Sequence, residues 1–160
     1  MSFDYKSAHS LEGKKVIVTG AGGNLGAEIC RGLTAMGASV LATDVAVEKG
    51  QAIVEELTAA GATAHFLEHD VTDEAQWEAA VATAIEKLGG LNGVINNAAI
   101  VPMNYLAELE VEEYNRVLNV NVTGSMLGCK HGFRAMQPGG PAGKGGSIIN
   151  MSSVMGLAGT

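Results

Sequence analysis

A glycine-rich loop stands between a short apolar run and the helical pattern that follows it. It reads Thr-Gly-Ala-Gly-Gly-Asn-Leu-Gly over positions 19–26. Small residues let a backbone turn tightly and approach a pyrophosphate, and the N-terminus of the next helix supplies free N–H groups with partial positive charge. An ordinary tight turn would not need four glycines. The loop therefore predicts a nucleotide-binding strand–loop–helix unit, with these candidate contacts: Gly20, Gly22, Gly23, Asn24, Leu25 and Gly26.

A carboxylate follows the loop at the distance that dinucleotide sites use. Asp44 ends the second apolar run, 24 residues after Gly20. Dinucleotide sites place a carboxylate about 20 residues on, where it accepts hydrogen bonds from the adenosine ribose. It would repel a 2′-phosphate, and neither following residue, Val45 or Ala46, is basic. These residues favour NAD over NADP, and the alternative is that Asp44 is a solvated residue capping the next helix.

Short apolar runs alternate with longer helical patterns along the chain. Strands are expected at 14–19, 38–43, 63–67, 91–95 and 147–151, and helices at 25–36, 48–60, 73–88 and 111–136. Thr72 or Asp73 is the expected N-cap of the third helix, and Gly89 follows its end. The alternation predicts an α/β fold, a Rossmann-like doubly wound parallel sheet with helices on both faces. A length of 160 residues suits one NAD(P)-binding domain.

Composition argues against several classes of protein. The chain has 10 Lys plus Arg against 17 Asp plus Glu, a formal net charge of -7, so we expect no nucleic-acid partner. We find no apolar run of membrane-spanning length and no signal peptide. The four histidines are scattered, and Cys30 and Cys129 form no Cys-x-x-Cys pair. We therefore expect no metal site, and a cytoplasmic location with two free thiols.

Five blocks in order resemble the classical short-chain dehydrogenase/reductase family. They are the glycine loop, Asp70-Val71, Asn96-Asn97-Ala98-Ala99, Asn121-Val122-Thr123-Gly124, and the run from Gly146 to Ser153. The resemblance covers the chain from about Leu11 onward. It implies NAD-dependent hydride transfer between a secondary alcohol or ketone and nicotinamide, with this chain bearing mainly the cofactor-binding part. It also implies a homodimer or homotetramer that pairs through the long helix.

The resemblance assigns four further residues to the nucleotide. Asp70 would line the adenine pocket through its side chain and Val71 through its backbone, while Asn96 and Ala98 would border the adenosine ribose. Plainer interpretations exist for single residues, since Asp70 would also suit a helix cap and Asn96 a tie between two strands.

Two catalytic candidates follow from the same resemblance. Asn121 would hold a relay water through its backbone, and Ser153 would hydrogen-bond the substrate oxygen, although a turn serine is the plainer interpretation. The family's Tyr-x-x-x-Lys pair is absent, because none of the three tyrosines has Lys four residues later. A phenol needs a nearby ammonium to exchange protons at neutral pH. We therefore expect negligible turnover from the chain as written, with the C-terminal strands and helices that carry this pair missing from it.

The loop also departs from the family pattern. Asn24 replaces the middle glycine of Thr-Gly-x-x-x-Gly-x-Gly, and asparagine tolerates left-handed backbone, so the turn is expected to survive. Ala99 is a milder departure, since it stands where the family has glycine. Gly23 and Gly26 also fit the loop of the extended branch of the family. Two alternatives therefore stay open, a non-catalytic dinucleotide-binding fragment or module and an extended-type nucleotide-sugar epimerase or dehydratase, although Asn96-Asn97 argues against the latter.

Overall fold

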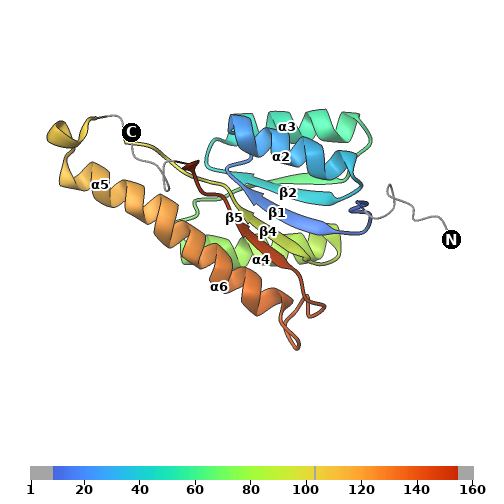
Figure 1. Ribbon diagram of the computed structural model, residues 1–160. Coiled ribbons are helices and arrows are strands. Elements are labelled where there is room, and N and C mark those ends of the chain that lie inside the picture. The colour runs from blue at the N-terminus through green and yellow to red at the C-terminus, as the bar shows by residue number, and fades with distance from the viewer. Residues whose placement is uncertain (1–8, 103, 155–160) are drawn as a thin grey trace.

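The computed structural model describes residues 9–102 and 104–154, which are built around one sheet of five parallel strands (Figure 1). The strands are β1 (Lys15–Thr19), β2 (Ser39–Asp44), β3 (Ala64–Glu68), β4 (Gly93–Asn96) and β5 (Ser147–Asn150). Their order in the sheet is β3-β2-β1-β4-β5, and every neighbouring pair is parallel. The prediction of a Rossmann-like parallel sheet is confirmed, and the strand ends differ from the expected ones by no more than two residues.

Helices cover both faces of the sheet (Figure 1). The helices α2 (Asn24–Ala35) and α3 (Val47–Ala59) lie on one face, and α4 (Glu74–Leu88) and α6 (Ser125–Met136) on the other. Side chains of β1 alternate between two buried clusters, with Val16 and Val18 in the first and Ile17 in the second. Because both faces of the central strand are buried, its sequence is a continuous apolar run rather than an alternating one.

The caps of α4 follow the sequence prediction. The side chain of Asp73 accepts hydrogen bonds from the backbone N–H groups of Ala75 and Gln76, which would otherwise have no partner within the helix. Gly89 ends the helix with a φ of 76°, in the left-handed region that favours glycine. Of the two N-cap candidates, Asp73 is therefore the correct one.

The long helical stretch predicted over 111–136 is not one regular helix. It consists of α5 (Val111–Leu118), a π-helical segment η2 (Asn119–Gly124) and α6, while a short 3-10 turn, η1 (Leu106–Glu108), precedes them. Gly128 faces the sheet so closely that a Cβ there would overlap Asn96 Oδ1 and lie 2.7 Å from Trp77 Cη2. Gly128 has a low helix propensity, yet it is the residue that lets the helix pack directly against β4.

Neither a disulfide nor a membrane helix occurs in residues 9–102 and 104–154. Cys30 and Cys129 are both free, and burial raises the pKa of the Cys30 thiol to about 12, so this thiol stays protonated. None of the helices in this part of the chain has the length and apolar character needed to cross a bilayer.

The strand order determines where a ligand can approach the sheet. The chain leaves β1 through α2 on one face, and it reaches β4 from α4 on the other face. Helices that diverge in this way open a crevice at the carboxyl ends of the two adjacent strands, which is where open α/β sheets bind ligands.

Candidate nucleotide-binding site

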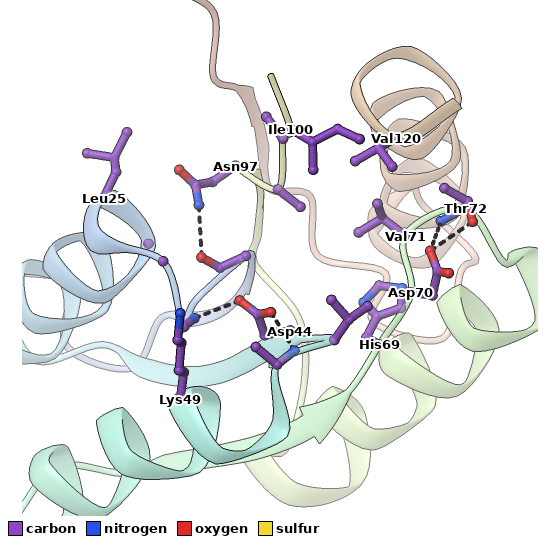
Figure 2. Close-up of a pocket in the computed structure, with 18 of the residues that line it drawn as sticks. Leu25, Asp44, Lys49, His69, Asp70, Val71, Thr72, Asn97, Ile100 and Val120 are labelled. Atoms are coloured by element: carbon purple, nitrogen blue, oxygen red, sulfur yellow. Dashed lines mark hydrogen bonds between the residues drawn. The ribbon is translucent and has the colours of Figure 1, made fainter. Parts of the chain in front are cut away.

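A cleft of about 690 Å³ opens at this crevice, and four loops and the α5–η2 junction line it (Figure 2). The loop after β1 contributes Gly20, Gly22, Gly23, Asn24, Leu25 and Gly26, and the segment after β2 contributes Asp44, Val45, Ala46 and Lys49. The loop after β3 contributes His69, Asp70, Val71 and Thr72, and the loop after β4 contributes Asn97, Ala98, Ala99 and Ile100. Arg116, Asn119 and Val120 complete the wall. Ten of the thirteen residues predicted to serve the site are therefore together in one cleft.

Close backbone contacts shape the glycine loop. Gly20 has a φ of 66°, and a Cβ there would lie 2.8 Å from Ala98 Cα. A Cβ on Gly26 would overlap the carbonyl oxygen of Gly20, so only glycine lets α2 begin this close to the turn. Asn24 does not use the left-handed backbone that we expected it to tolerate, because it is the first residue of α2 and Gly23 is the N-cap. Among the described residues, only glycines have positive φ.

Thr19 and Asn97 fix the position of this loop. Thr19 Oγ1 accepts hydrogen bonds from the backbone N–H groups of Asn97 and Ala98, both at 3.0 Å. Asn97 Nδ2 donates to the carbonyl oxygens of Thr19 and Gly20, at 2.9 and 3.2 Å. The ends of β1 and β4 are thereby tied together directly under the cleft, so the loop is held in place before any ligand arrives.

Both oxygens of the Asp44 carboxylate are anchored by backbone donors. Gly22 N–H donates to Oδ2 and Ala46 N–H donates to Oδ1, each at 2.8 Å. Each carboxylate oxygen has a further lone pair, so Asp44 can still accept hydrogen bonds from a ligand. Ala46 is the N-cap of α3 and no side chain caps this helix, so Asp44 contacts the residue before the helix rather than capping the helix itself. Asp44 therefore both ties the glycine loop to α3 and presents a fixed negative charge to the cleft.

Asp70 and Val71 form the wall below η2. Asp70 Oδ1 accepts from Thr72 N–H and Thr72 Oγ1, at 2.9 and 2.8 Å (Figure 2). The carbonyl oxygen of Val71 accepts from the indole N–H of Trp77 at 2.9 Å. The other Asp70 oxygen, Oδ2, has no hydrogen-bond partner in the part of the chain that the structure describes, which leaves it open to a donor on a ligand.

Three predicted site residues lie outside the cleft lining. Asn96 is buried, and its Nδ2 donates to Asn150 Oδ1 at 2.7 Å, so its side chain links β4 to β5 rather than facing the cleft. The Asn121 side chain accepts from the N–H of Ile100 and donates to its carbonyl, both at 2.9 Å. Ser153 is exposed, three residues beyond the end of β5. Asn121 thus acts on the cleft indirectly, by holding the loop that carries Ile100.

The structure adds His69 to the cleft wall. Only 1% of His69 is exposed, its Nδ1 lies 3.0 Å from Thr43 Oγ1, and its ring is perpendicular to Trp77 with centroids 4.5 Å apart. Its Nε2 has no partner among the described residues. Burial lowers the pKa of His69 to about 4, against the opposite effect of the Asp70 and Asp73 carboxylates, so the ring is neutral at pH 7.

Two cations of the cleft were also missed. Arg116 and Lys49 both line it, although sequence reasoning considered only the two residues directly after Asp44. Lys49 lies in the first turn of α3, where helical geometry brings its side chain back toward the helix N-terminus and the cleft. Lys49 could have been found in the sequence by considering the first turn of the helix that follows Asp44, rather than only the two residues directly after Asp44.

Comparison with known proteins matches residues 14–160 to the short chain dehydrogenase family model. The chain is 41% identical over 150 residues to 3-alpha-(or 20-beta)-hydroxysteroid dehydrogenase of Mycobacterium bovis, covering 94% of this chain and 55% of that protein. It is 36% identical over 152 residues to trans-4-hydroxycyclohexanecarboxylate dehydrogenase of Sinomonas cyclohexanicum, covering 91% and 57%. The chain thus spans little more than half the length of these relatives.

Solved structures agree with the sequence match. A short-chain type dehydrogenase/reductase from Mycobacterium marinum superposes with a TM-score of 0.91 at 27% identity, covering 99% of this chain and 63% of that one. A short chain dehydrogenase from Burkholderia cenocepacia, solved in complex with NADP, superposes at 0.83 with 30% identity, covering 94% and 59%. Because the family model matches nearly the whole chain and the fold agrees, this protein belongs to the short-chain dehydrogenase/reductase family of oxidoreductases.

Proposed function

We propose that residues 1–160 form one NAD-binding domain of an oxidoreductase that transfers a hydride between a secondary alcohol or ketone and nicotinamide. The observation that carries the proposal is Asp44, whose carboxylate lies in the cleft with both oxygens anchored by backbone N–H groups. An acceptor held in this way suits the two hydroxyls of the adenosine ribose and opposes a phosphate in their place. NAD is therefore the preferred dinucleotide.

The remaining cleft residues suit the rest of such a ligand. The N-terminus of α2 and the loop from Gly20 to Gly26 offer backbone N–H groups to a pyrophosphate, and Asp70 offers Oδ2 to an adenine amino group. Bound nicotinamide supplies the site that accepts or gives the hydride. In this proposal Ser153 hydrogen-bonds the substrate oxygen, and Asn121 holds a water through its backbone carbonyl, which already accepts from Ser125 Oγ at 2.8 Å.

The substrate class is proposed from the relatives. Their names share an alicyclic skeleton bearing a hydroxyl group: hydroxysteroid, hydroxycyclohexanecarboxylate and, for a 37% identical protein of Sphingobium indicum, a dichlorocyclohexadienediol. We therefore propose an alicyclic secondary alcohol, or the ketone derived from it, as the substrate of the whole protein.

Isothermal titration calorimetry with NAD+ and NADP+ tests the cofactor. NAD+ should bind more tightly, and Asp44→Ala should weaken NAD+ binding by roughly tenfold to a hundredfold, because hydrogen bonds to a charged group are lost. Glu86→Gln, an exposed charge change near the end of α4, serves as the control. NADP+ binding that equals or exceeds NAD+ binding in the parent chain would contradict the proposal.

A non-catalytic dinucleotide-binding module is the second candidate. It shares the dinucleotide-binding cleft of the first candidate. Both candidates expect NAD+ to bind, but only an enzyme of the relatives' full length would reduce it. These 160 residues lack the acid–base pair that the reaction needs, so we expect no rise in absorbance at 340 nm when this chain meets NAD+ and a cyclohexanol. Steady NADH formation would exclude the second candidate. Apart from the spacing of Gly23 and Gly26, no observation favours the extended-branch epimerase or dehydratase, and the matching family model is that of the short chain dehydrogenases.

We also propose a cytoplasmic homodimer or homotetramer. Two free thiols support a reducing compartment, which cell fractionation would test.

Exposed apolar side chains along α5, η2 and α6 support assembly: Val111, Tyr114, Leu118, Val122, Met126 and Phe133, each at least 40% exposed. A surface of this kind on consecutive helical turns is typical of an interface, and sedimentation equilibrium of the chain would measure its mass.

A further inference from the structure

We propose that His69 is a positioning residue of the cleft, which sets the distance between the two carboxylates, Asp44 and Asp70, that the adenosine half of the cofactor would contact. The inference rests on the proposed function, because it concerns how the same cleft is held in shape. In Figure 2 the ring of His69 lies between these two aspartates. Only 1% of His69 is exposed, so it acts through its neighbours rather than by contact with a ligand.

Two contacts join His69 to the end of β2. Its backbone N–H donates to the carbonyl oxygen of Asp44 at 3.1 Å, and its ring Nδ1 lies 3.0 Å from the hydroxyl oxygen of Thr43, which is also buried. Thr43 directly precedes Asp44, and His69 directly precedes Asp70. The buried ring therefore links the two chain positions from which the carboxylates of the cleft extend.

The segment after His69 is also bonded to α4. The backbone N–H of Asp70 donates to Gln76 Oε1 at 2.8 Å, and the indole N–H of Trp77 donates to the carbonyl oxygen of Val71 at 2.9 Å. The segment and the start of α4 are thus one bonded unit. The His69 ring packs at right angles to that of Trp77, with centroids 4.5 Å apart, and its bond to the threonine hydroxyl ties this unit to β2.

The hydrogen-bond pattern places the proton of the neutral ring on Nδ1. Thr43 Oγ1 donates its single proton to the carbonyl oxygen of Val18 at 3.4 Å, so this hydroxyl accepts from His69 Nδ1–H. Nε2, which has no partner among the described residues, then carries no proton, and no buried N–H of the ring lacks an acceptor. A phenyl ring would fill the same space but could not make the bond to Thr43.

A ligand that contacts both carboxylates requires them at one distance from each other. In the proposed function, the adenosine ribose donates to Asp44 and the adenine amino group donates to Asp70. If the two anchors shift relative to each other, a smaller fraction of the molecules can bind, and the apparent affinity falls by that fraction. A ligand that is left with one of the two anchors does not sense the distance between them.

Calorimetric titration with NAD+ tests the inference in the parent, His69→Phe and Asp44→Ala proteins and in the double variant. His69→Phe should weaken NAD+ binding about threefold to tenfold, the usual value of one hydrogen bond. In the Asp44→Ala background the same change should cost less than about twofold, because only one anchor remains. A change that merely loosened the fold would weaken binding by the same factor in both backgrounds.

Variants of the bonding partner and of a distant core residue serve as controls. Thr43→Val should reproduce the loss of affinity, while Thr43→Ser keeps the hydroxyl and should restore the affinity of the parent. Leu88 is buried in the same apolar cluster as Trp77 but is the last residue of α4. Leu88→Val should therefore lower stability without changing NAD+ affinity, and thermal unfolding establishes that each protein is folded at the titration temperature.

Equal losses for His69→Phe in the two backgrounds would show that this inference is wrong and leave the proposed function intact, as would parent-like affinity in Thr43→Val. The pair of Thr43 variants decides the question if His69→Phe does not fold. If the parent chain binds no NAD+, the proposed function is wrong, and this inference fails with it.

Discussion

His69 couples the cleft wall to the stability of the fold. Its ring is 99% removed from solvent, its pKa is lowered to about 4 by burial, and its ordinary value is 6.5. Between pH 6.5 and about pH 4, the imidazole of His69 binds a proton in the unfolded chain but stays neutral in the folded chain. The free energy of unfolding therefore falls as the pH falls. We expect the free energy of unfolding to drop by on the order of 2 to 3 kcal/mol between pH 7 and pH 4.5 from this group. Urea unfolding at a series of pH values measures the drop.

The variant His69→Phe separates this effect from that of the carboxylates. Phenylalanine keeps an aromatic ring against Trp77 but cannot take up a proton, so the loss of stability between pH 7 and pH 4.5 should become shallower. The lowered pKa values of Asp73 and Glu74 also reduce stability in acid, and these residues are unchanged in the variant. An identical pH dependence in both proteins would show that His69 does not titrate on unfolding.

Single residues differ in how well the sequence predicted them. Asp44 was predicted because a fixed spacing from the glycine loop places it at a strand end, which is a property of the chain. Lys49 and Asn96 depend on which way a side chain points from its element, and spacing does not determine that direction. Asn96, for example, lies at the end of β4, but its amide turns to Asn150 and to the carbonyl oxygen of Ser125.

At the scale of elements, Gly128 decides how closely α6 approaches the sheet. Substitution by alanine would place a Cβ on Asn96 Oδ1 and against Trp77, and the helix would have to move away. We expect Gly128→Ala to lower the free energy of unfolding by about 1 to 3 kcal/mol, the usual cost of overpacking a core. Gly32→Ala in α2 is the matched control, because open space surrounds that position. The control should gain up to about 1 kcal/mol from helix propensity.

Urea unfolding of both variants checks this prediction. If Gly128→Ala gained as much stability as Gly32→Ala, the packing of α6 would not depend on the absence of a side chain at position 128. The comparison also explains a limit of sequence reasoning. Glycine has the same low helix propensity at both positions, and only the neighbouring strand distinguishes a packing contact from a weak place in a helix.

At the scale of the whole molecule, alternation of strands and helices was enough to predict the parallel sheet and its two helical layers. The reason is that right-handed crossovers and buried parallel strands leave few other arrangements. The π-helical segment η2 was not foreseen, and the contact of its Asn121 side chain with the backbone of Ile100, 21 residues away, is not visible in a local sequence pattern. The cleft could be located in advance only as a region, since its walls come from five separate segments.

The outer face of η2 and α6 carries the exposed apolar side chains that the proposed assembly would cover. Val122, Met126 and Phe133 are 59%, 50% and 62% exposed. The steps of four and seven residues between them place all three on one side of the helical stretch. Two copies that pair this face would bury apolar surface that a lone chain leaves in water.

The double variant Met126→Asp/Phe133→Asp tests this pairing, because two buried carboxylates in such an interface would lack partners. By sedimentation equilibrium we expect the parent chain to be a dimer or larger and the variant to be a monomer. Leu106→Asp in η1 is the control, since Leu106 is 88% exposed but lies outside α5, η2 and α6, and it should leave the mass unchanged. A parent chain that stays monomeric at high concentration, or a double variant that assembles as the parent does, would place the interface elsewhere.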